Sequence, residues 1–167
     1  TGDGKGKTTA ALGLALRAAG HQQKVLILQF IKGCWISGEV RAISSIPQIE
    51  IKQLGSGFIP FKQGKPLINP ELKMEAEQAL QYALEQAKNS SYDLIILDEI
   101  NNMVDYGLAS PEQVLNIINN KKPEMVLVLT GRNAHPKIIE AADTVTEMKQ
   151  IKHAFQHGIK AIKGIEY

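Results

Sequence analysis

A glycine-rich loop that could bind phosphate opens the chain, with the sequence TGDGKGKTT at positions 1–9. Its glycines let backbone N–H groups turn toward phosphate oxygens, and Lys7 can neutralise the outer phosphates of a nucleotide. The Thr8 hydroxyl can bind Mg²⁺, while the following helix directs its positive end at the anion. The full Walker A pattern would place its first glycine where this chain has Thr1. We expect a nucleoside triphosphate here, rather than a glycine turn that only caps a helix. The residues expected to bind it are Gly2, Asp3, Gly4, Lys5, Gly6, Lys7, Thr8 and Thr9.

An apolar segment that ends in two carboxylates supplies the second half of a nucleotide site. Residues 94–97 read LIIL and are followed by Asp98 and Glu99. A buried strand that delivers carboxylates opposite the loop threonine is typical of a Walker B motif, because carboxylate oxygens bind the metal ion that accompanies ATP. Alone the pattern is weak, since an aspartate at this place often only caps a helix. Together with the loop it predicts a site for Mg²⁺ or Mn²⁺ formed by Thr8, Asp98 and Glu99.

Two basic and two aromatic residues are further candidates. Arg132 follows an apolar run through Gly131, where an arginine can reach a phosphate group or form a structural ion pair instead. Lys5 flanks the loop and can add a second positive charge to the phosphate site. Phe58 and Phe61 lie in a segment punctuated by glycine and proline, where they could cover a flat apolar ligand or only anchor the segment to the core.

Segments with the patterns of strands and helices alternate along the chain, and they must position these residues. Continuous apolar runs predict strands that are covered on both faces. Strands are expected at 24–31, 49–54, 93–97, 125–129 and 144–148. The first helix is apolar nearly all round and is therefore expected to be buried, and the next two begin at an Asn-Pro N-cap and at a capping box. Helices are expected at 8–19, from 69 to about 87, at 110–119 and at 136–142. Residues 55–68 read as one long loop.

The alternation predicts an α/β fold of the P-loop NTPase kind, a three-layer sandwich with a mostly parallel central sheet and helices on both faces. In such a sheet, ligands bind beyond the carboxyl ends of the strands, where the glycine loop, Asp98-Glu99 and Arg132 all fall. We expect a single domain over residues 1–167. A P-loop normally follows a buried strand, so that strand is expected before Thr1.

The composition excludes several other classes. A net charge of +2 gives no broad basic face for nucleic acid. The single cysteine, Cys34, excludes a disulfide framework and fits a reducing, cytoplasmic compartment. No apolar run reaches the roughly 18 residues of a transmembrane helix, so no membrane partner is expected. His153 and His157 are spaced i, i+4, but without an evident third ligand a structural role is favoured over a metal site.

The motifs together resemble the ATP:corrinoid adenosyltransferases of the cobalamin-synthesis type. The resemblance extends over the chain in order and is more specific than either Walker motif. It lies in Gly4–Ala11, Gln29–Gly33 with Gly38-Glu39, Leu97–Glu99, Leu129–Arg132, Ala142–Glu147, Lys152–Phe155 and Gly164–Tyr167.

The resemblance implies transfer of the 5′-deoxyadenosyl group of ATP to the cobalt(I) of a reduced corrinoid, with release of triphosphate. By similarity, Lys7 holds the triphosphate, Thr8 and Glu99 hold Mg²⁺, and Arg132 lies near the phosphates. A cytoplasmic homodimer is expected, with a reduced flavoprotein as electron donor. The family places a Gly-Phe-x-Trp stretch against the corrinoid to ease cobalt reduction. This chain has Pro60 in place of the tryptophan, and Phe61 is the candidate substitute.

The residues agree with that chemistry, because cobalt(I) is itself a nucleophile and needs no protein base. The protein must bind a tetra-anion, neutralise the leaving triphosphate and place cobalt in line. One alternative is a P-loop ATPase or small-molecule kinase in which Glu99 polarises water or an acceptor hydroxyl. Another is a regulatory module that binds ATP without turnover.

Overall fold

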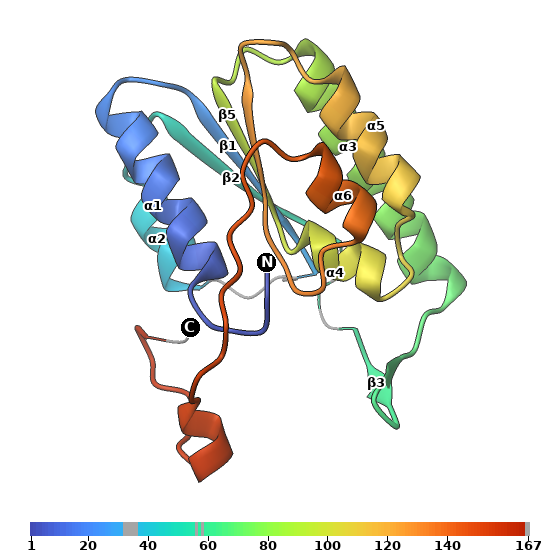
Figure 1. Cartoon of the computed structure of the whole chain (residues 1–167). Coiled ribbons are helices and arrows are strands. Elements are labelled where there is room, and N and C mark those ends of the chain that lie inside the picture. Colours follow the sequence, from blue (N-terminus) through green and yellow to red (C-terminus); the bar gives the residue numbers. More distant parts are fainter. Residues whose placement is uncertain (32–36, 56, 58, 166–167) are drawn as a thin grey trace.

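The computed structural model describes residues 1–31, 37–55, 57 and 59–165. Its centre is a four-stranded sheet with the strand order β2-β1-β5-β6 (Figure 1). The strands are β1 (Val25–Phe30), β2 (Ile49–Leu54), β5 (Leu94–Asp98) and β6 (Val126–Leu129). Neighbouring strands all run parallel, which confirms the expected α/β fold with a parallel sheet.

Helices cover both faces of the sheet, as Figure 1 shows. Because side chains alternate along a strand, β1 contributes Val25 and Ile27 to one apolar cluster and Leu26 and Leu28 to the other. The first cluster is completed by α1 (Lys7–Gly20) through small residues such as Ala15. The sheet is therefore buried on both faces at its centre.

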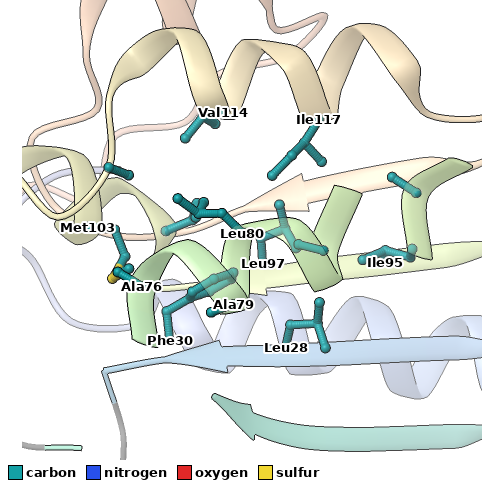
Figure 2. Packing of buried hydrophobic residues seen from close by; sticks show 14 of the residues in the cluster. Leu28, Phe30, Ala76, Ala79, Leu80, Ile95, Leu97, Met103, Val114 and Ile117 are labelled. Carbon is teal, nitrogen blue, oxygen red and sulfur yellow. The ribbon is translucent and has the colours of Figure 1, made fainter. Parts of the chain in front are cut away.

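The second cluster lies under α3 (Pro70–Asn89) and α5 (Pro111–Asn120). Figure 2 shows Leu80, Val114 and Ile117 gathered on the side of the sheet that carries Leu28 and Leu97. Both helices begin where the sequence predicts. The Asn69 side chain accepts a hydrogen bond from the Leu72 N–H at 2.8 Å, and Ser110 and Gln113 form a reciprocal capping box.

Short helices fill the remaining connections. They are α2 (Gly38–Ile43), α4 (Ile100–Asp105), α6 (Pro136–Ala141) and a 3₁₀ helix at Ala154–His157. The helix expected near residue 136 is thus confirmed, whereas α2 and α4 were not predicted. Each has only six residues, too few for an apolar period to emerge from the sequence, and neither begins with a proline as the equally short α6 does.

Two expectations about burial are wrong. Helix α1 is not covered all round, since Leu14 and Leu16 are 41% and 60% exposed and only its alanine face packs on the sheet. Strand β6 is not covered on both faces, since Val126 is 58% exposed. The reason is position: β6 is the last strand in the order of the four-stranded sheet, where fewer elements pack over it.

Residues 144–148 do not form the expected strand, but they run extended beside the start of the chain. The amino group of Thr1 donates to the Thr146 carbonyl at 2.8 Å, the Met148 N–H donates to the Thr1 carbonyl at 2.7 Å, and the Gly4 N–H donates to the Met148 carbonyl at 2.6 Å. An apolar groove of about 430 Å³ separates this segment from β6. The segment therefore pairs with residues 1–4 and not with the sheet.

The expected loop at 55–68 contains a small antiparallel hairpin of β3 (Phe61–Lys62) and β4 (Lys65–Pro66). It projects from the body of the domain in Figure 1. Its turn holds Gln63 and Gly64, both with positive φ, which explains the glycine at this place. The segment was predicted without regular structure because strands of two residues leave no detectable pattern.

Candidate active site

A cleft of about 860 Å³ lies at the carboxyl ends of β1 and β5 and brings most of the predicted site residues together. From the glycine loop it is lined by Asp3, Gly4, Lys5, Gly6, Lys7, Thr8 and Thr9. Glu99, Arg132 and Phe61 line it from three other segments. Of the groups expected at the carboxyl ends of the strands, the glycine loop, Glu99 and Arg132 thus lie together, and their roles stay predictions. Gly2 and Asp98 do not line the cleft, and Phe58 lies outside the described residues.

The glycine loop is folded tightly around its lysine. The Lys7 ammonium donates to the carbonyl oxygens of Gly2 and Gly4 at 2.6 and 2.7 Å. A Cβ at Gly2 or Gly4 would lie 2.6 Å from the Met148 carbonyl oxygen, so only glycine fits at either position. Gly6 has φ 107° at the N-cap of α1, again a conformation that favours glycine.

The charge of Lys7 is balanced by its neighbours. Burial lowers the pKa of the Lys7 ammonium below its usual value, the Glu99 carboxylate opposes this shift, and the Arg132 guanidinium adds to it. These three side chains therefore lie within electrostatic reach of one another. A triphosphate bound between Lys7 and Arg132 would raise the pKa of Lys7 again, because an anion stabilises the protonated form of lysine.

Asp98 is buried behind the cleft and binds the Thr8 hydroxyl. Its side chain, 1% exposed, accepts hydrogen bonds from the Thr8 hydroxyl at 2.9 Å, the Thr130 hydroxyl at 2.7 Å and the Gln29 amide at 3.3 Å. The Thr130 hydroxyl in turn accepts from the Glu99 N–H at 2.9 Å. Asp98 thus orients Thr8 and, through Thr130, the backbone of Glu99.

Glu99 stands at a strained turn between β5 and α4. Its φ of 68° is a left-handed conformation that a residue with a side chain adopts at an energetic cost. The Glu99 carboxylate lines the cleft together with Thr8. Their oxygen atoms suit Mg²⁺, which is bound through one or two carboxylates together with substrate phosphates. In the described part of the chain, no group of three His, Cys, Asp or Glu side chains could hold a metal ion on its own.

Arg132 is placed by its backbone. Its N–H donates to the Asn102 side-chain oxygen at 2.6 Å, and Gly131 has φ 132° with no room for a Cβ beside that oxygen. Its own side chain is exposed and lines the cleft. The loop after β6 therefore packs directly on α4.

Asn102 and Tyr106 line the cleft and were missed by the sequence reasoning. Tyr106 packs edge to face on Phe61, with ring centroids 5.3 Å apart and planes at 84°. A signal was available: Asn102 and Tyr106 follow Glu99 by three and seven residues, the spacing of one helix face. His153 also lines the cleft, but His157 does not, so the two histidines do not form a pair there.

No helix in the described ranges is long and apolar enough to cross a membrane.

The chain is similar to known proteins along its whole length. A family model described as ATP:corrinoid adenosyltransferase BtuR/CobO/CobP matches residues 1–167. A corrinoid adenosyltransferase of Escherichia coli K12 is 40% identical over 167 residues, which cover 100% of this chain and 83% of the relative. The corrinoid adenosyltransferase CobA of Salmonella typhimurium LT2 is 39% identical over 168 residues, again with 100% of this chain and 83% of the relative. A corrinoid adenosyltransferase of Pseudomonas aeruginosa PAO1 is 39% identical, with 81% of the relative covered.

Proposed function

The chain belongs to the ATP:corrinoid adenosyltransferase family, and from this membership we propose that it transfers the 5′-deoxyadenosyl group of ATP to the cobalt(I) of a reduced corrinoid. A cobalt–carbon bond forms at C5′ while the bond from C5′ to the triphosphate oxygen breaks. Triphosphate leaves with the bonding electron pair. Both electrons of the new bond come from cobalt(I), so no oxidant or protein base enters the step.

The observation that carries the proposal is the meeting of a phosphate-binding loop and an aromatic pair in one cleft. Lys7 and Arg132 stabilise the charge that develops on the leaving triphosphate, since fixed cations aimed at a developing charge lower the barrier. Phe61 and Tyr106 offer an apolar surface of the kind that a flat macrocycle needs. A hydrolase would need a base that activates water, whereas a cobalt nucleophile does not.

Mg²⁺ would be held by Thr8 and Glu99, with Asp98 orienting Thr8 from behind. When bound, the ion neutralises phosphate charge. This chain contributes Thr8 and Glu99 to the lining of one cleft, with buried hydrogen bonds that orient the Thr8 hydroxyl and the Glu99 backbone. We also propose a homodimer in the cytoplasm that receives electrons for cobalt reduction from a reduced flavoprotein.

The test is incubation of the protein with MgATP and chemically reduced cobalamin. We expect the visible spectrum of adenosylcobalamin to appear together with one equivalent of triphosphate. ADP with an acceptor phosphate ester, or ADP with inorganic phosphate, would instead identify a kinase or an ATPase. Tight ATP binding without any product would identify a regulatory module.

A further inference from the structure

We propose that Asn102 is a positioning residue that ties the phosphate side of the cleft to its aromatic side, and that Tyr106, which Asn102 holds, contacts the corrin macrocycle. The second part rests on the proposed function. The first part depends only on how Asn102 connects Arg132 to Tyr106.

Asn102 uses both ends of its amide. The side-chain oxygen accepts from the Arg132 N–H at 2.6 Å, and the side-chain nitrogen donates to the Tyr106 hydroxyl at 3.4 Å. A backbone N–H can only donate, so the amide oxygen must face Arg132 and the nitrogen is left for Tyr106. The orientation of the amide is therefore fixed by its partners.

The contact to the Arg132 loop is close as well as polar. A Cβ at Gly131 would lie 2.6 Å from the Asn102 side-chain oxygen, so the loop touches this side chain directly. Asn102 is half-buried and lines the cleft itself. Loss of its side chain would remove the polar part of the surface on which the loop that carries Arg132 rests, beside the Cβ of Asn101.

Tyr106 extends the link to the hairpin. Its ring forms an edge-to-face pair with that of Phe61, which is 47% exposed on β3. Such an edge-to-face pair fixes the relative orientation of two rings. Tyr106 and Phe61 both line the cleft, so a flat apolar ligand bound there would lie against them.

The reaction needs this kind of coupling. Cobalt and the bond between C5′ and triphosphate must be in line, and a displacement of about 1 Å can reduce a rate by roughly 100-fold. The phosphates are bound beside Arg132 and the macrocycle beside Tyr106. A side chain that contacts the holders of both substrates sets their relative position.

The experiment compares steady-state kinetics of Asn102→Ala with those of Asn133→Gly. The Asn133 amide joins the same loop to α4 by donating to Asp105 at 3.1 Å, outside the cleft. Glycine adopts its φ of 48° without strain, so this control removes a similar link and nothing from the cleft. We expect Asn102→Ala to lower kcat about 10- to 100-fold and to raise KM for both ATP and cob(I)alamin. Equal kinetics in the two variants would overturn the positioning role.

Tyr106→Leu tests the contact with the macrocycle. We expect KM for cob(I)alamin to rise about 3- to 10-fold while KM for ATP stays within about twofold. A rise confined to ATP would show that Tyr106 faces the nucleotide and would overturn this part. If Asn102→Ala does not fold, Tyr106→Phe decides, because it removes only the hydroxyl end of the link. A cob(I)alamin KM equal to that of the unmodified chain would then contradict the proposal.

Failure of the proposed function is recognised separately, because the unmodified chain would then release no triphosphate with reduced cobalamin. Calorimetry of MgATP binding still tests Asn102 in that case. Weaker binding in Asn102→Ala than in Asn133→Gly supports the link to Arg132, and equal binding overturns it.

Discussion

Replacing Asp98 by asparagine should destabilise the fold, whereas replacing Glu99 by glutamine should mainly change metal use. Asp98 accepts hydrogen bonds from three donors, the hydroxyls of Thr8 and Thr130 and the amide of Gln29. Asparagine has one acceptor oxygen and one NH₂ group. Whichever way it is turned, the NH₂ group faces a donor.

The size of the effect follows from these contacts. A hydrogen bond to a charged group contributes about 1.5–3 kcal/mol, and asparagine loses one or two of them. We therefore expect the free energy of unfolding to fall by about 2–4 kcal/mol, which for a chain of 167 residues lowers Tm by roughly 5–15 °C. Glu99→Gln keeps the size of a side chain that faces the cleft, so its Tm should change by less than about 3 °C.

The assay pairs thermal unfolding with calorimetry of ATP binding at several Mg²⁺ concentrations. Glu99→Gln should need more Mg²⁺ for the same ATP affinity, while nucleotide binding without metal changes little. Asp98→Asn should change both the Mg²⁺ requirement and nucleotide binding without metal, because Thr8 loses the acceptor that orients it. The reasoning is refuted if Asp98→Asn has the same Tm as the unmodified chain. It is also refuted if Asp98→Asn raises the Mg²⁺ requirement and Glu99→Gln does not.

Four further outcomes are expected. Lys7→Ala should weaken MgATP binding about 10- to 100-fold in a chain that still folds, and unchanged affinity by calorimetry would contradict the role of Lys7. Because the pKa of Lys7 is lowered in the free protein and a triphosphate raises it, MgATP binding at alkaline pH should take up a proton and weaken as pH rises. The binding enthalpy should then depend on the ionisation enthalpy of the buffer, and Lys7→Met should abolish that dependence. Phe61→Ala should lose more activity when the assay starts from cobalt(II) than from cobalt(I), since only cobalt(II) must shed its lower ligand before reduction; an equal loss from both would mean that Phe61 only holds the hairpin. The apolar groove beside β6 should accept a parallel strand placed before Thr1. A chain extended by such an apolar strand should therefore have a higher Tm than the chain beginning at Thr1. An unchanged Tm would argue against a strand in this groove.

The parts of the fold that sequence could predict are those fixed by local chemistry. Asn69 and the Ser110 capping box mark helix starts because their side chains bond to backbone groups three residues away. Long apolar runs mark β1 and β5 because both of their faces are covered. The exposure of Val126 and the irregular course of residues 144–148 could not be predicted, since both depend on which segments lie beside them in space.

The candidate site also has some residues that the sequence predicts and others that only the fold reveals. The glycine loop and Glu99 carry short motifs whose chemistry is tied to residue type, and the structure places them in one cleft. The left-handed backbone of Glu99 could not be predicted, because glutamate, unlike glycine, does not indicate a positive φ. The spacing from Glu99 could place Asn102 on the cleft, but its contact with Arg132 joins positions 30 apart along the chain, which no local pattern reveals.

The packing of the glycine loop against Met148 also sets when this protein can become active during its synthesis. The Gly4 N–H and the Thr1 backbone bond to residues about 145 positions later, and Gly2 and Gly4 press against the same stretch. A ribosome makes the loop about 145 residues before it makes this support. The nucleotide site therefore takes its final shape only after almost the whole domain has emerged, because contacts of such long sequence separation form late. A nascent chain that stalls before Met148 carries a Walker A sequence without the backbone partners that hold its loop.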